Sequence, residues 1–173
     1  MNGDDLVPAI VITLSAVAMI WDLRTRRIPN LLTFGAAAGA FAYHLAVGGM
    51  PALLSAAGGW VVGVALFVPY FLLGGMGAGD VKLLGGLGAW LGPASSFWLC
   101  VYSAMAGGVM AIVVAVAHGY GRQAMRNIWM LLMHWRVVGL RPFPELTLEQ
   151  TRGPRLAYAV PIMAGVLVTL WLK

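Results

Sequence analysis

Long apolar runs alternate with short polar connections along the whole chain. Runs of spanning or near-spanning length cover residues 6–23, 31–47, 52–73, 81–91, 97–117 and 156–172. Inside a bilayer only helices or closed barrels satisfy the backbone hydrogen bonds, and these runs lack the alternation typical of barrel strands. The pattern predicts an all-α polytopic membrane protein with about six transmembrane helices.

The fourth run is too short to cross a bilayer by itself. It offers about 12 residues, or ~18 Å of helix, against ~30 Å of hydrocarbon. Either the glycine-rich connection before it dips into the membrane, or the helix continues through Pro93. The glycines favour the first alternative, and irregular backbone at that depth needs protein or a water-filled cavity around it. We therefore expect a wet pocket near Asp80.

Residues 122–140 show a different pattern, with apolar positions on one arc of a helical wheel and arginines near the other. This pattern predicts a cytoplasmic interfacial helix attracted to anionic lipid head groups. The alternative is a seventh membrane segment over residues 128–140, which Arg136 disfavours. Residues 141–155 are predicted to form an exposed linker.

Composition supports one membrane-embedded unit. Of the 173 residues, 61% are hydrophobic and 10% are charged, whereas a typical soluble domain is roughly 25% charged. The polar stretches are too short to fold separately, so we expect a single domain over residues 1–173. The lone Cys100 excludes an intramolecular disulfide and a multi-thiolate zinc site, and we predict neither a metal nor a cofactor.

The basic residues predict the topology. Ten of the eleven Lys and Arg residues fall on connections that share one side of the membrane, while Lys173 lies on the other. The positive-inside rule makes the first side cytoplasmic, so both termini point away from the cytoplasm. We expect a multi-pass protein of the cytoplasmic (inner) membrane whose first helix is retained, because acids precede its apolar run. Topology also explains the net charge of +5, so no nucleic-acid partner is predicted.

Two acids stand out by position. Of the six in the chain, only Asp22 and Asp80 lie at ends of predicted membrane helices, both on the cytoplasmic side. A carboxylate within a membrane helix costs ~2.5–3.5 kcal/mol on insertion scales and is therefore usually functional. Two neighbouring carboxyl groups do not both ionise cheaply, so one serves as base and the other as acid. This pair predicts aspartic-protease chemistry and leaves open which carboxyl group is the acid.

Residues next to Asp80 are candidates for substrate binding. Gly77 and Gly79 would allow strained backbone angles and a close approach of the substrate strand. Lys82 would tune Asp80 or touch the substrate; the alternative is a lysine at a helix end that simply snorkels to the interface.

The segments "DLRTRRIPN", with Asp22, and "GAGDVKL", with Asp80, resemble the paired signatures of type IV prepilin peptidases. The resemblance implies that Asp22 and Asp80 are catalytic and that the basic leader of a prepilin is cut at the cytoplasmic membrane face. A late "YAVPIMAG" segment is similar to the family's proline-containing final helix, which we expect Pro161 to kink. The paired C-x-x-C motifs of the larger, methylating members are absent, so the chain resembles the compact peptidases of Flp-type, tight-adherence pili, or the related archaellin and pseudopilin processors.

Other functions remain as alternatives. The acids of a small proton-coupled transporter would form a relay, and a catalytically silent assembly component would need no acids. The G-x-G-D motif is also similar to that of presenilin-like intramembrane proteases. For the peptidase, the expected partners are a prepilin or pseudopilin and the lipid bilayer, with a small residue such as glycine just before the cut.

Overall fold

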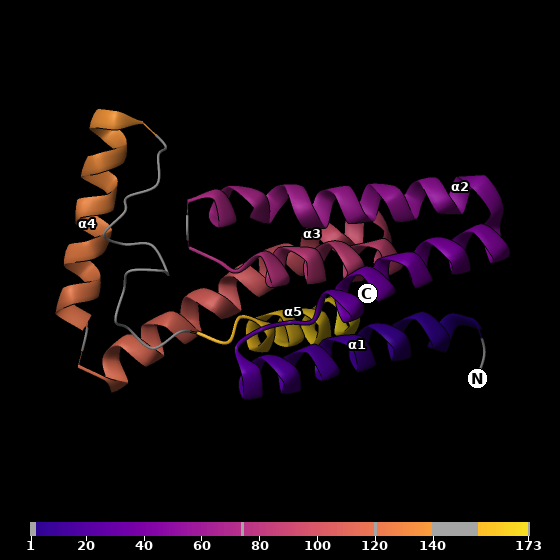
Figure 1. The fold of residues 1–173 in the computed structure, drawn as a ribbon, viewed down its shortest axis with the longest axis horizontal. Coiled ribbons are helices and arrows are strands. Elements are labelled where there is room, and N and C mark those ends of the chain that lie inside the picture. Colours follow the sequence, from indigo (N-terminus) through magenta and orange to yellow (C-terminus); the bar gives the residue numbers. More distant parts are fainter. Residues whose placement is uncertain (1–2, 74, 120, 140–155, 173) are drawn as a thin grey trace.

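Helices are the only regular elements in the residues that the structure describes. The computed structural model describes residues 3–73, 75–119, 121–139 and 156–172. Its helices are α1 (Gly3–Thr25), α2 (Asn30–Leu72), α3 (Ala78–Ala117), α4 (Gly121–Val138) and α5 (Ala159–Trp171). Figure 1 shows α1, α2, α3 and α5 side by side in one bundle, with α4 apart from them. The predicted all-α class is confirmed.

Helices α2 and α3 are each interrupted by one glycine. Gly49 (φ 62°, ψ −155°) and Gly92 (φ 76°, ψ 172°) have non-helical backbone angles that only glycine adopts without strain. Pro51 and Pro93 follow them closely and do not donate backbone hydrogen bonds to a continuing helix. Figure 1 shows both helices doubling back. Each therefore contains two of the predicted apolar runs, and the chain breaks just before Pro93.

Contacts along the first half of α3 show how α2 folds around it. Near the start of α2, Trp90 Nε1 donates a 2.9 Å hydrogen bond to the carbonyl of Ala36. After the interruption in α2, the backbone of Gly59 lies directly against that of Gly88. The two halves of α2 therefore pack against the same stretch of α3, which brings the start of α2 to the start of α3.

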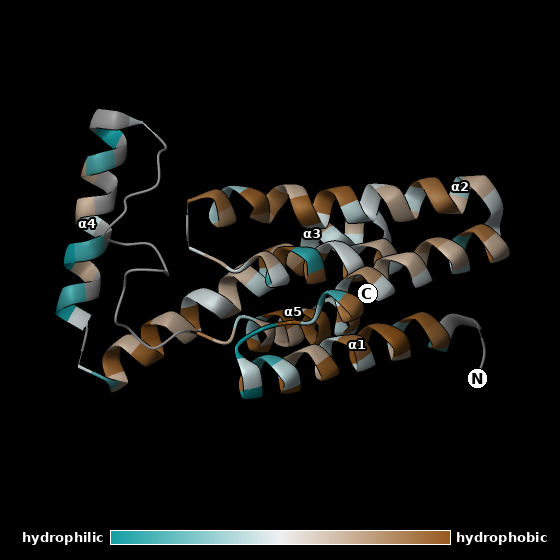
Figure 2. Cartoon of the chain, in the orientation of Figure 1, coloured by the Kyte–Doolittle hydropathy of each residue, from teal (hydrophilic) through white to brown (hydrophobic). Residues whose placement is uncertain are grey.

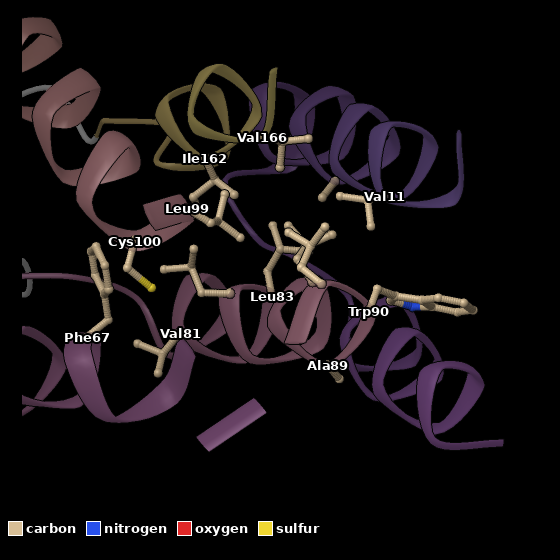
Figure 3. Close-up of a cluster of buried hydrophobic side chains, with 14 of the residues drawn as sticks. Val11, Phe67, Val81, Leu83, Ala89, Trp90, Leu99, Cys100, Ile162 and Val166 are labelled. Atoms are coloured by element: carbon tan, nitrogen blue, oxygen red, sulfur yellow. The ribbon is translucent and has the colours of Figure 1, made fainter. Parts of the chain in front are cut away.

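The core lies between α1, α3 and α5. Figure 3 shows Val11 from α1 and Leu83 and Leu99 from α3 pointing toward Ile162 and Val166 of α5. All five side chains are fully buried. Removing such side chains from an apolar core leaves cavities that cost several kcal/mol each, so these residues hold the three helices together.

The helices of the bundle are mostly apolar, as their largely brown to white colour in Figure 2 shows. Among the described residues, three helices are long and apolar enough to cross a membrane: Asp5–Thr25, Asn30–Leu72 and Ala78–Ala117. Large apolar side chains such as Leu31, Val47 and Val116 are more than two thirds exposed, as expected for a lipid-facing surface. The chain is a membrane protein by these features, and the count of six crossings stays a prediction.

Three predictions in the second half of the chain have different outcomes. Helix α4 covers most of the segment predicted to be interfacial, although its position on a membrane surface stays a prediction. The predicted linker of residues 141–155 lies outside the described residues. The predicted kink at Pro161 is wrong: α5 begins at Ala159, so Pro161 lies in the first turn, where no hydrogen bond from its nitrogen is needed.

Candidate active site

Asp22 lies in the last turn of α1, and its side chain is only 6% exposed. Its Oδ2 atom accepts a 3.3 Å hydrogen bond from the backbone N–H of Ala159. Ala159 is the first residue of α5, and the N-cap residue Tyr158 makes no capping hydrogen bond with its own side chain. The first N–H groups of a helix have no partner within the helix and carry partial positive charge. The carboxyl group of one helix is therefore held by the N-terminus of another.

Asp80 lies in the first turn of α3, as predicted. Its backbone N–H donates a 3.2 Å hydrogen bond to the carbonyl of Gly77, the N-cap residue. Its carboxyl group reaches back to the backbone of the same glycine and interacts with it by a hydrogen bond. An acid at this position of the first turn closes the helix start in the manner of a capping box. The local geometry therefore orients Asp80.

The carboxyl groups of Asp22 and Asp80 are close enough to interact electrostatically. They come from the end of α1 and the start of α3, which are 58 positions apart by subtraction (80 − 22). The start of α5 completes the cluster through Ala159. The structure thus brings together the two acids that the sequence singled out, with a backbone N–H donor on one of them.

The two signature segments also contact each other. A Cβ atom on Gly79 would lie 3.2 Å from Cβ of Ile28, so the two backbones approach closely at that point. Lys82 Nζ donates a 2.9 Å hydrogen bond to Oδ1 of Asn30 and lies 5.1 Å from the ring centroid of Phe34. These contacts orient the Lys82 ammonium group, in contrast with a lysine that snorkels freely.

Comparison with protein families agrees with this geometry. Residues 9–112 match the model of the type IV leader peptidase family, and this span contains both acids and both signature segments. The chain belongs to the type IV leader peptidase family. Neither a curated protein nor a solved structure matches it significantly. Membership gives the chain a leader-peptidase-like function, directed in general at prepilin substrates.

The glycines of this family member's G-x-G-D motif are not explained by strained backbone angles. Gly77 has φ −77° and ψ 146°, which any residue adopts. Gly79 is not among the described glycines with positive φ. The expectation of strained angles is therefore wrong for both motif glycines. Space is the reason for them instead, because a Cβ atom would lie 3.0 Å from Asp80 Oδ2 at Gly77 and 3.2 Å from Ile28 at Gly79.

Tyr158 is a neighbour of the acids that the sequence did not single out. Burial raises the pKa of its hydroxyl above the usual value near 10, and the charges of Asp80 and Tyr70 raise this pKa further. The hydroxyl therefore stays protonated at neutral pH. Its position directly before the "AVP" start of α5 is visible in the sequence, but no sequence signal places that helix start beside Asp22.

Proposed function

We propose that this leader peptidase is an aspartic endopeptidase that removes the basic leader of Flp-like prepilins at the cytoplasmic face of the inner membrane. Asp22 and Asp80 are its catalytic residues. The observation that supports this most is that two acids from different helices, one of them buried, lie close enough to interact electrostatically. Apolar surroundings make two adjacent negative charges costly, which favours a pair that holds one proton.

The reaction follows from such a pair. One ionised carboxyl group takes a proton from a water molecule, and the water oxygen attacks the carbonyl carbon of the leader peptide bond. The protonated partner donates toward the developing oxyanion. When the tetrahedral intermediate collapses, the C–N bond breaks, the leaving nitrogen takes a proton, and the leader departs as a carboxylic acid.

Gly77, Gly79 and Lys82 form the proposed substrate-binding side of the site. Both glycines lie within three residues of Asp80 and lack side chains that would cover it. Lys82 presents a positive charge that is oriented by Asn30 and Phe34. Close packing around these glycines leaves little room beside Asp80, so a small residue such as glycine is expected before the cut, and a bulky residue there should slow cleavage.

Substitution of the two acids tests the proposed function. Asp22→Asn and Asp80→Asn each remove an ionisable group with little change of shape, so each should lower prepilin cleavage by about 10²-fold or more, the usual scale of general acid–base catalysis. Asp5→Asn is a matched control, because Asp5 is exposed near the start of α1. The purified variants are compared in lipid vesicles by N-terminal sequencing of the product and by proton flux.

Each outcome has a clear meaning. Cleavage that survives either substitution contradicts the aspartic mechanism. Loss of proton flux, with no proteolysis by the native chain, supports the transporter instead. Cleavage within the transmembrane helix of the substrate, with the leader left attached, supports a presenilin-like protease.

A further inference from the structure

The start of α5 binds one of the two acids directly. Its first backbone N–H, from Ala159, binds Asp22 in a buried setting, and Ala159 itself is fully buried. At 3.3 Å this bond is already slightly longer than the usual range of about 2.7–3.2 Å, so there is little room for further lengthening. A small displacement of the α5 start would therefore release the Asp22 carboxyl group.

Tyr158 is the residue that precedes this N–H. Its ring packs against α3, where a Cβ atom on Gly107 would lie 3.3 Å from Cε1 of the ring. Its backbone carbonyl accepts a 3.2 Å hydrogen bond from the N–H of Ile162, which fixes the first turn of α5. Ring and backbone together connect the α5 start to α3, the helix that carries Asp80.

We propose that Tyr158 is a positioning residue of the acid pair: its ring, packed against Gly107, holds the first turn of α5 so that the Ala159 N–H stays on the Asp22 carboxyl group. This proposal rests on the aspartic mechanism proposed above. The groups that act electrostatically on Tyr158 are Asp80 from α3 and Tyr70 from α2. Asp22 from α1 also lies nearby, because it accepts a hydrogen bond from Ala159, the residue that follows Tyr158.

The chemical consequence concerns the position of the Asp22 carboxyl group. The Ala159 N–H holds this group in place, and small displacements of a reacting group are costly in rate. Loss of the hydrogen bond should therefore lower kcat of the folded enzyme and leave KM nearly unchanged. A purely structural role for Tyr158 would lower the amount of folded enzyme and leave kcat of the folded fraction unchanged.

Truncation of the ring tests this proposal. In purified full-length enzyme in nanodiscs, Tyr158→Ala should lower kcat for prepilin cleavage at least tenfold per folded enzyme and leave KM within about twofold. Tyr158→Phe keeps the ring and should restore kcat to within about threefold. Tyr102→Ala is the control, because Tyr102 stacks on Trp98 in the same helix as Gly107, and its kcat should match that of the native chain.

A second variant covers the case in which Tyr158→Ala does not fold. Gly107→Ala keeps the tyrosine but pushes its ring by a few tenths of an ångström, so it should cause a smaller loss of kcat with KM nearly unchanged. An unchanged kcat in the folded variants overturns the positioning role. If Asp22→Asn also remains active, the aspartic mechanism itself fails; if Asp22→Asn is inactive, only the role of Tyr158 is rejected.

Discussion

Gly77 limits the freedom of the Asp80 side chain at the level of single atoms. A methyl group at this position would lie 3.0 Å from Oδ2 of Asp80, closer than carbon and oxygen normally approach. The carboxyl group also uses the Gly77 backbone as a hydrogen-bond partner. The motif glycine thus determines where the carboxyl group sits, in addition to any contact with the substrate.

Gly77→Ala should therefore lower kcat by about tenfold or more, because small displacements of a reacting group are costly in rate. KM should rise less than kcat falls, because the substitution displaces Asp80 directly, whereas Gly77 is only one part of the proposed substrate-binding side. Gly75→Ala is the matched control: its Cβ atom would meet only the carbonyl of Tyr70, at an ordinary 3.5 Å. Steady-state kinetics on equal amounts of folded enzyme measure both. A large rise in KM with unchanged kcat would instead indicate that Gly77 serves substrate approach.

At the level of helices, glycine pairs allow α2 and α3 to approach until their backbones touch. Gly59 and Gly88 face each other directly, and Ser96 Oγ donates a 2.9 Å hydrogen bond to the Gly59 carbonyl beside them. Close backbone approach through small residues is a common way for membrane helices to associate, because lipid provides no hydrophobic drive between them. This packing supports the segment that begins with Asp80.

Gly88→Ala should destabilise the bundle, because the new Cβ atom would collide with the Gly59 carbonyl and with Ser96 Oγ. Overpacking of this kind costs about 1–3 kcal/mol or more in free energy of unfolding. Gly108→Ala is the control, since nothing lies within 4 Å of its Cβ position, and alanine is favoured over glycine in a helix by roughly 0.5–1 kcal/mol. Thermal unfolding in detergent should separate the two variants. Equal stability would contradict the close α2–α3 contact.

At the level of the whole molecule, the two acids gather at one end of the bundle. The connections from α1 to α2 and from α2 to α3 are at this end, whereas α2 doubles back at the other (Figure 1). The basic residues Arg24, Arg26 and Arg27 follow Asp22 directly. The positive-inside rule therefore predicts that the acid pair lies on the cytoplasmic side.

Thiol labelling of intact cells tests this orientation. In a Cys100→Ala background, Met50→Cys should react with a membrane-impermeant reagent added outside, whereas Arg27→Cys should react only after permeabilisation. Both positions are exposed in the structure, and Cys100 is buried, so its removal changes little at the surface. Labelling of position 27 from outside would reverse the predicted topology.

Local sequence patterns were sufficient for several features. Hydropathy determined the all-α class, because a bilayer leaves the backbone few ways to satisfy its hydrogen bonds. Gly49 and Gly92 fall in the predicted gaps between apolar runs, since glycine and proline disfavour a continuing helix. Asp22 and Asp80 were found because acids at membrane helix ends are costly. Their catalytic roles stay predictions.

Tertiary structure alone decided how the acids are held. The bond from Ala159 to Asp22 joins residues 137 positions apart, and it depends on how α1, α3 and α5 pack. The space-limiting roles of Gly77 and Gly79 also depend on neighbours placed by the fold, whereas backbone angles suggested from sequence alone were wrong. Periodicity and cost of burial act within one segment, but the approach of distant segments is set by the packing of all of them together.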